Sequence, residues 1–255
     1  MTSDDSLKIV SRSGSGTDQS LSLPIFLGDE HPCPYLPLRN SRNQFTFAQR
    51  IDPRVYQQMM DVGFRRSGLV VYRPICTACQ ECIPIRVPVE QFKPSRSQNR
   101  ALKKNRDVRV SIAPPEYSSA KWDVYARYLQ YQHDGTMSDD PLDLQQFLYS
   151  SVTDTLEMTY TLAGRIIAVG IVDITDRALS SVYFFFDPEE HKRSLGVFGA
   201  LIEIEECRRR GLPYWYVGYY IRDCDRMNYK AGYRPAELLG SDGNWKAIDA
   251  NPAGS

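Results

Sequence analysis

The pattern of hydrophobic residues changes from a helical to a strand period in the second half of the chain. Apolar and aromatic residues recur every three to four positions across 117–132 and again across 142–152, which predicts two amphipathic helices. From residue 155 the apolar residues form runs separated by turn residues such as Ala163-Gly164, and such runs predict strands. The predicted strands are 155–162, 165–174 and 178–187.

A further helix and a further strand are expected after these three. The apolar stretch that ends at Arg210 is followed by Gly211, the residue type that most often takes the left-handed position after a helix. Residues 213–220 are rich in Trp and Tyr and are typical of a strand. Two helices, three strands, a glycine-containing loop, a helix and a strand follow one another in the order of a GNAT-like (acyl-CoA N-acyltransferase-like) fold.

The first half of the chain has shorter elements with clear start signals. Asp52-Pro53 places an N-cap residue before a proline, so we expect a helix from there to Gly63. Alternating apolar residues predict a strand over 83–89, and residues 95–106 predict a strongly polar helix. Pro114-Pro115 marks a boundary.

The predicted architecture is α+β, with mixed, mainly antiparallel sheets flanked by helices. We expect three parts. Residues 1–29, rich in Ser, Gly and Asp, form a flexible N-terminal segment; residues 30–113 form a basic, cysteine-containing domain; and residues 114–250 form a C-terminal GNAT-like transferase domain.

Charge is spread unevenly along a chain whose formal net charge is zero. Residues 33–109 hold fifteen Lys and Arg against five Asp and Glu. A segment this basic suits phosphate or carboxylate partners, although a solvated basic face is an equal alternative. The polar helix over 95–106 carries much of this charge and little apolar surface, so we expect it to contact phosphate.

Two absences narrow the cellular setting. No run of eighteen apolar residues occurs, so we expect no membrane partner. The polar N-terminus lacks the basic-then-apolar order of a signal peptide. We therefore expect a cytoplasmic protein, in which cysteines serve as thiols or metal ligands rather than disulfides.

Four cysteines have the spacing of a metal site. Cys76, Cys79 and Cys82 are separated by two residues each, and Cys33 lies upstream. Four thiolates could hold a tetrahedral zinc ion or an iron–sulfur cluster, and four reduced thiols without metal are the alternative. Cys207 and Cys224 are interpreted as structural.

Several separate motifs together span about residues 30–248: Cys33-Pro-Tyr-Leu-Pro37, Gly63-Phe-Arg-Arg-Ser-Gly68, Cys76 to Arg86, Ser95-Arg-Ser-Gln98, Phe184-Phe-Phe-Asp-Pro188, Ser194-Leu-Gly196 and Gly218 to Lys230. They resemble the motifs of the arginyl-tRNA–protein transferase family, and within it those of the bacterial aspartate/glutamate leucyltransferases.

This resemblance implies two GNAT-like domains, leucyl-tRNA as donor, and acceptor proteins that begin with Asp or Glu and are marked for N-end-rule degradation. It makes an iron–sulfur cluster plausible, because related eukaryotic arginyltransferases are associated with one. No cofactor is required by the transfer chemistry itself. An arginyl donor, or a non-catalytic cysteine-metal RNA-binding module, would be the alternatives.

The implied reaction is aminolysis of an ester, for which orientation, a proton acceptor and charge stabilisation matter more than a strong enzyme nucleophile. We expect catalytic roles for Asp187, Tyr219 and Lys230. Asp187 could accept the amine proton or could merely cap a turn. Tyr219, Tyr229 and Lys230 could hold the terminal adenosine of the tRNA, although tyrosines are more often core residues.

Arginines are the candidates for recognising the acidic acceptor, because a guanidinium makes two parallel hydrogen bonds to a carboxylate. The acceptor-binding candidates are Arg65, Arg66, Arg73 and Arg86, and each could equally contact tRNA or solvent. The tRNA backbone is assigned to Arg96, Arg100, Lys103, Lys104 and Arg106.

The loop before the last helix resembles the pyrophosphate loop of acetyl-CoA-dependent enzymes but ends differently. Arg193-Ser-Leu-Gly196 fits, whereas Phe198 stands where a small residue is needed for close backbone approach. We therefore expect no acetyl-CoA partner. His133 and His191 are weaker acid–base candidates.

Overall fold

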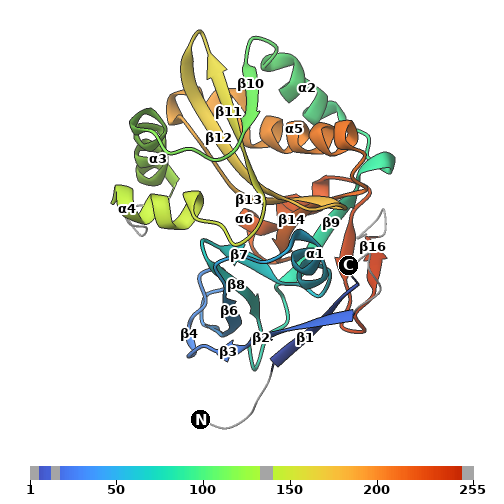
Figure 1. Cartoon of the computed structure of the whole chain (residues 1–255). Coiled ribbons are helices and arrows are strands. Elements are labelled where there is room, and N and C mark those ends of the chain that lie inside the picture. The colour runs from blue at the N-terminus through green and yellow to red at the C-terminus, as the bar shows by residue number, and fades with distance from the viewer. Residues whose placement is uncertain (1–5, 13–17, 133–139, 249–255) are drawn as a thin grey trace.

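A computed structural model describes residues 6–12, 18–132 and 140–248 of the chain. Its upper part in Figure 1 is a large sheet with helices on both faces, and its lower part is a small sheet with one helix. His133 lies outside the described residues.

The large sheet has eight strands in the order β10-β11-β12-β13-β14-β9-β15-β16. All neighbours are antiparallel except β13 and β14, which are parallel because α5 connects them. This confirms the α+β class with a mixed, mainly antiparallel sheet. The strands are β9 (Ile83–Pro88), β10 (Arg109–Ala113), β11 (Thr155–Leu162), β12 (Arg165–Ile174), β13 (Ala178–Phe186), β14 (Tyr214–Tyr220), β15 (Glu237–Leu239) and β16 (Trp245–Ala247).

Helices cover both faces of this sheet (Figure 1). On one face, α5 (Leu195–Arg210) packs on β13 and β14, and α2 (Arg96–Lys104) packs on α5. On the other face lie α3 (Ser119–Gln132) and α4 (Pro141–Leu144), which continues as a π-helical turn, η2 (Gln145–Tyr149). The expected helix over 142–152 is therefore shorter and irregular.

The small sheet has the order β3-β6-β8-β7 and packs against α1 (Pro53–Asp61). Its strands are β3 (Phe26–Leu27), β6 (Asn43–Phe47), β7 (Arg65–Ser67) and β8 (Val70–Pro74). Two further pairs are β1 (Ser6–Arg12) with β2 (Asp18–Pro24) and β4 (His31–Pro32) with β5 (Asn40–Ser41). Strands β1 and β2 lie within the segment 1–29 that the composition predicts to be flexible.

Local start and stop signals hold as predicted. The Asp52 side chain accepts the Arg54 N–H at the start of α1, and Pro53 is its first residue. Ser95 and Gln98 form a reciprocal capping box at the start of α2. Gly211 ends α5 with φ +69°, a conformation that favours glycine.

Strands from both sides of the predicted domain boundary share the large sheet. β9 and β10 lie within residues 30–113, yet β9 pairs with β14 and β15, and β10 pairs with β11. The division into domains at 113 stays a prediction. Among the described residues, no helix is both long enough and apolar enough to cross a membrane.

The parallel pair at the centre of the sheet stays together only briefly. β13 and β14 pair from Ala178 to Ser180 and from Tyr214 to Tyr216 and then diverge. The remaining short helices are η1 (Val89–Gln91), η3 (Pro188–Arg193), α6 (Asp225–Asn228) and η4 (Tyr229–Gly232), and α6 and η4 follow β14 where it has left β13. The divergence leaves room for a cleft between the two strands.

Candidate active site

A cleft of about 730 Å³ opens where β13 and β14 separate, which we call the central cleft. It is lined by residues of β7, α3, β13, β14, α6 and η4, so segments far apart in the sequence meet there. Most of its walls are aromatic or apolar, and its buried charged groups are Arg65, Arg66 and Lys230. A large concave site with a few convergent polar groups is the usual form of a ligand site.

Arg65, one of the residues that line this cleft, has hydrogen-bond donors without a partner. Its side chain lies on β7, and the residue is 5% exposed. Nη1 donates to the carbonyl oxygens of Met60 (3.3 Å) and Phe64 (2.6 Å), whereas Nε and Nη2 find no acceptor within the described part of the chain. A buried N–H without an acceptor costs about 1–3 kcal/mol, so the arrangement favours a ligand that accepts two hydrogen bonds.

Aromatic rings hold the Arg65 guanidinium in place. Its Cζ lies 5.0 Å from the ring centroid of Tyr216 and 5.8 Å from that of Tyr219. Such cation–π contacts stabilise the charge without using its N–H groups. The free edge of the guanidinium therefore keeps its orientation.

Lys230 adds a second buried cation to the cleft. The residue is 8% exposed, and its Nζ donates to the carbonyl oxygen of Tyr219 at 2.8 Å. Burial, followed by the neighbouring charge of Arg65, lowers the pKa of Lys230 to about 8. Two cations repel each other there, and an anionic ligand would relieve that repulsion.

The other three candidate arginines are already occupied. The Arg66 side chain is fully buried, and its guanidinium binds the carboxylate of Asp173 at 2.7–2.8 Å. Arg73 donates to the carbonyl oxygen of Val62 at 2.8 Å. Arg86 pairs with Glu237 at 2.7 Å and with Asp61 at 3.5 Å.

Asp187 is surrounded by donors and lies outside the set of residues that line the central cleft. Its carboxylate pairs with Arg127 at 3.1 Å and with Arg165, and it accepts the Glu189 N–H as the cap of η3. These contacts use the lone pairs that a general base needs. A catalytic role for Asp187 stays a prediction, which this geometry does not favour.

The two tyrosines differ in exposure. Tyr219 is buried, and its hydroxyl donates to the carbonyl oxygen of Gly63 at 2.8 Å. Burial raises the pKa of Tyr219 well above its ordinary value, so it remains protonated. Tyr229 is 56% exposed at the rim of the cleft, where its ring is open to a ligand.

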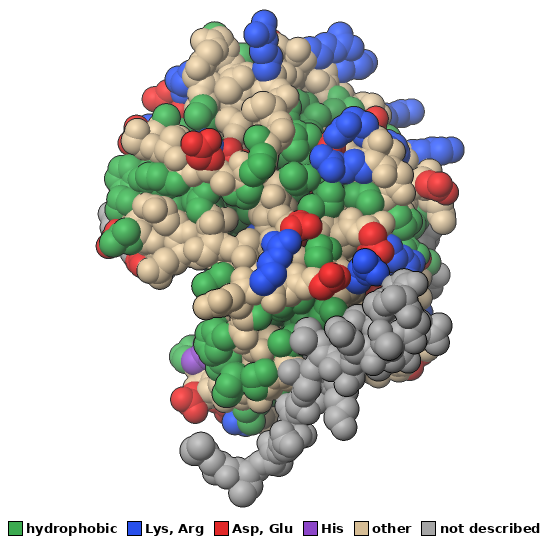
Figure 2. Space-filling model, viewed as in Figure 1, with side chains coloured by type: hydrophobic (Ala, Val, Ile, Leu, Met, Phe, Trp, Pro, Cys, Tyr) green, Lys and Arg blue, Asp and Glu red, His purple; other side chains and the backbone are tan. Residues whose placement is uncertain are grey.

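The five predicted tRNA-binding residues are exposed on α2 and just after it: Arg96, Arg100, Lys103, Lys104 and Arg106. Figure 2 shows Lys and Arg side chains gathered along the upper edge of the molecule, where Figure 1 places α2. The structure thus forms a basic surface on one side of the large sheet.

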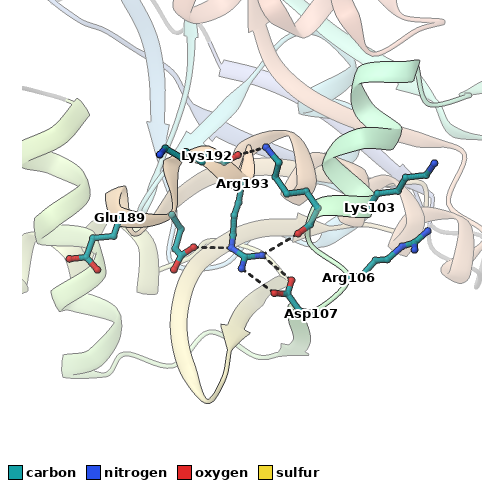
Figure 3. A pocket seen from close by; sticks show the side chains of 8 residues that line it. Lys103, Arg106, Asp107, Glu189, Lys192 and Arg193 are labelled. Atoms are coloured by element: carbon teal, nitrogen blue, oxygen red, sulfur yellow. Dashed lines mark hydrogen bonds and ion pairs between the residues drawn. The ribbon is translucent and has the colours of Figure 1, made fainter.

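The end of α2 meets η3 in a shallow basic pocket of about 500 Å³ (Figure 3). Lys104 Nζ donates to the carbonyl oxygen of Lys192 at 2.5 Å. Arg193 makes two hydrogen bonds to Asp107, at 2.9 and 3.0 Å, and one to Glu190 at 2.8 Å. Arg193 is therefore neutralised, while Lys103 and Arg106 point outward (Figure 3).

We expected no acetyl-CoA partner because Phe198 would obstruct the loop, and the position of Phe198 does not support that reason. Phe198 is 5% exposed and packs into the core, with its ring 5.8 Å from that of Tyr160. Its side chain therefore does not obstruct the outside of the loop. His191 is exposed, and its Nδ1 lies 2.9 Å from the carbonyl oxygen of Pro188.

The cysteines lie near one another but do not form the predicted metal site. Cys33 Sγ accepts the Leu36 N–H at 3.4 Å, and Cys79 Sγ accepts from Arg39 Nη1 at 3.2 Å. Burial, with smaller effects of the thiols of Cys76, Cys33 and Cys79, raises the pKa of Cys82 to about 12. Across the described residues, no group of three or more His, Cys, Asp or Glu side chains is placed to hold a metal ion. The thiol placement therefore does not fit a four-thiolate zinc ion or an iron–sulfur cluster.

A carboxylate beside the central cleft has no counterpart among the predicted site residues. Glu203 of α5 is 1% exposed, and burial raises its pKa to about 7. The sequence pattern could have identified Glu203, because it lies on the apolar face of the predicted helix, four residues after Gly199 and four before Cys207. A charged residue on a buried helix face indicates a functional or paired group.

Comparison with known proteins gives consistent results along nearly the whole chain. The family model described as arginine-tRNA-protein transferase, N terminus, matches residues 31–100, and that of the C terminus matches residues 120–240. An aspartate/glutamate leucyltransferase of Marinobacter nauticus is 39% identical over 233 residues, which is 90% of this chain and 98% of that protein. One of Chromobacterium violaceum is 41% identical over 235 residues, 90% of this chain and 96% of that protein.

Similarity to solved structures is weaker. The C-terminal domain of a putative lysylphosphatidylglycerol synthetase from Agrobacterium fabrum has a TM-score of 0.47 and 11% identity, with 79% of this chain and 82% of that chain covered. That level is too low to bear on the fold. The sequence relatives and the two family models together show that the chain belongs to the aspartate/glutamate leucyltransferases, a family of aminoacyltransferases with arginine-tRNA-protein transferase domains.

Proposed function

We propose that this chain transfers leucine from leucyl-tRNA to the free N-terminus of proteins that begin with Asp or Glu, and that the reaction takes place in the central cleft. The observation that carries this proposal is the buried guanidinium of Arg65, whose Nε and Nη2 have no acceptor among the described residues. The names of the relatives support the donor and the acceptor class.

The acceptor side chain would bind in the orientation that Arg65 dictates. Its carboxylate takes the two free N–H groups as a bidentate pair, with Lys230 supplying a second positive charge. Lysine and neutral side chains are rejected, because they would leave the buried donors unpaired or add a third positive charge. Asp and Glu differ by one methylene, which such a cleft discriminates only weakly.

The same two cations help the chemistry. The acceptor's α-amino group has an ordinary pKa of about 8, and nearby positive charge lowers the pKa of an ammonium group. More of the amine is then neutral and nucleophilic at physiological pH. Its nitrogen bonds to the leucyl carbonyl carbon, the ester bond to the tRNA ribose breaks, and the amine proton passes to the leaving ribose oxygen.

The tRNA would approach across the basic surface of α2. The exposed ring of Tyr229 at the rim of the cleft suits stacking on the terminal adenosine, and the exposed cations of α2 suit the phosphates. Leucyl-tRNA is used where proteins are made, so we place the chain in the cytoplasm under the same proposal. The cysteine loop serves to position the basic segment and takes no part in the transfer. The tagged proteins enter N-end-rule degradation.

A donor comparison tests the function. The chain is incubated with a peptide that starts with Asp and with either leucyl-tRNA or arginyl-tRNA, and the mass of the peptide product is measured. We expect addition of leucine from the first donor and little addition of arginine from the second. Arginine transfer alone would overturn the donor assignment, and tRNA binding without any transfer would indicate an RNA-binding module.

A further inference from the structure

A second cavity of about 260 Å³ adjoins the central cleft, which we call the side cavity. The two cavities are adjacent, because they share six lining residues: Tyr128, Ser181, Phe184, Phe186, Val217 and Tyr229. The apolar lining of the side cavity includes Val197 and Ala200 of α5 and Phe184 of β13. An apolar cavity of about 150 Å³ can hold benzene, so this one has room for a leucyl side chain.

Glu203 places a carboxylate in this apolar cavity. Its Oε2 accepts from Trp215 Nε1 at 2.7 Å, and its Oε1 accepts from Ser181 Oγ at the long distance of 3.5 Å. No Lys, Arg or His of the described residues forms an ion pair with it. A carboxylate buried without a cation is costly, so a ligand that brings a positive charge would stabilise the site.

The remaining groups around Glu203 are neutral near pH 7. Tyr160, Cys207 and Tyr233 interact with its charge, and burial raises the pKa of each, so all three stay protonated. Tyr229 faces the cavity from η4. With a pKa of about 7, Glu203 is partly ionised near pH 7, and none of these groups balances the charge of its carboxylate form.

We propose that Glu203 binds the α-ammonium group of the leucyl residue carried by the tRNA, while the apolar walls of the side cavity bind the leucyl side chain. Glu203 then recognises the donor amino acid, and Arg65 recognises the acceptor. The inference rests on the proposed function. It assigns opposite charges to the two substrates: a carboxylate on Arg65 and an ammonium on Glu203.

Two consequences follow for donor choice. An arginyl side chain would place its guanidinium against Val197, Ala200 and Phe184, which offer it no acceptor, so an arginyl donor is rejected. A donor whose α-amine is acylated, as in any peptidyl-tRNA, has no ammonium for Glu203 and leaves that carboxylate unpaired.

The test compares two donors that differ only at this group. Leucyl-tRNA and 2-hydroxyisocaproyl-tRNA, in which a hydroxyl replaces the amine, are titrated against the wild-type chain, and binding is measured separately from transfer. We expect leucyl-tRNA to bind at least about 30-fold more tightly, the effect of leaving one partner of a buried charge pair unmatched. Equal binding of the two donors would overturn the proposal.

Variants assign the preference to one side chain. Glu203→Gln keeps an oxygen for Trp215 and removes the charge, so it should weaken leucyl-tRNA binding about 30-fold and change binding of the hydroxy donor less than about threefold. Glu205→Gln, on an exposed residue of the same helix, is the matched control and should change neither. Equal loss for both donors in Glu203→Gln would instead indicate a structural or proton-accepting role and would contradict the proposal.

The binding readout keeps this inference separate from the proposed function. If the wild-type chain discriminates the two donors through Glu203 but transfers leucine to no acceptor, the donor site stands and the transfer activity does not. If it transfers leucine without discriminating between the donors, the reverse holds. Glu203→Asp, which keeps the charge, should retain part of the preference.

Discussion

Replacing Arg65 with Gln should remove most of the selectivity for acidic acceptors. Arg65 offers two unpaired N–H groups in a site where it is 5% exposed. Removing one partner of a buried, hydrogen-bonded charge pair costs about 2–5 kcal/mol, or about 30-fold to several thousand-fold. Because Lys230 retains its charge beside the lost group, we expect an effect in the lower half of this range.

The assay measures kcat/KM for leucyl transfer to two otherwise identical peptides, one starting with Asp and the other with Asn. Asn has the shape of Asp without its charge, so their ratio isolates recognition of the carboxylate. In the wild type the ratio should be large, and in Arg65→Gln it should fall at least about 30-fold, to the residual preference that the Lys230 charge supplies. Arg65→Lys keeps the positive charge but cannot make two parallel hydrogen bonds to a carboxylate. Its Asp-to-Asn ratio should therefore lie between those of the wild type and Arg65→Gln.

Arg65 also donates hydrogen bonds to backbone carbonyl oxygens and makes cation–π contacts with aromatic rings, so its replacement could disturb the fold. Melting temperatures and leucyl-tRNA binding of each variant control for this. A folded Arg65→Gln variant that binds tRNA normally and still prefers Asp to Asn by the wild-type ratio would refute the assignment. Recognition would then belong to another group of the cleft.

Three further outcomes follow from the contacts. Arg66→Gln breaks a fully buried ion pair and should lower the free energy of unfolding in urea by about 3–5 kcal/mol, with an unchanged Asp-to-Asn ratio; a loss below about 1 kcal/mol would contradict a structural role. Burial lowers the pKa of Lys230 to about 8, so its charge is lost as the pH rises through 8; the preference for Asp should fall above that pH, and Lys230→Met should lack this step. Replacing both Arg100 and Lys103 with Gln should reduce the slope of the logarithm of the tRNA association constant against log salt by about one per lost phosphate contact. The control is Arg209→Gln, on an arginine paired with a glutamate of its own helix, which should leave the slope unchanged.

The helices and their ends could be predicted because their signals are local. The Asp52 cap, the capping box at Ser95 and the glycine after α5 each involve residues within a few positions of one another. The pairing of β9 with β14 joins residues far apart in the chain. No local pattern predicts that partner, so the sequence alone placed β9 in a separate domain.

The roles of residues in the candidate active site also depend on partners that are distant in the sequence. Arg65 and Arg66 are neighbours of the same type, both buried, and both line the cleft. They differ because Asp173, distant in the sequence, pairs with Arg66 and leaves Arg65 unsatisfied. The sequence makes both arginines candidates, but only the tertiary structure distinguishes the structural cation from the one available to a ligand.

Asp187 and Glu203 show how the surroundings of a carboxylate bear on the role assigned to it. Asp187 stands in a motif and at a strand end, which made it the candidate base, yet two arginines and a backbone N–H surround it. Glu203 lies within an apolar helix, where its burial beside a cavity depends on how α5 packs on the sheet. A carboxylate's function here follows from what it faces rather than from its motif.

The most direct test of the account is a competition among acceptors in one reaction. Peptides that start with Asp, Glu, Asn and Lys, otherwise identical, are mixed with leucyl-tRNA and the wild-type chain, and the products are counted by mass spectrometry. We expect leucine on the Asp and Glu peptides, with the Asn and Lys peptides nearly unmodified. Comparable leucine addition to the Asn or Lys peptide would contradict recognition of an acidic N-terminus by Arg65.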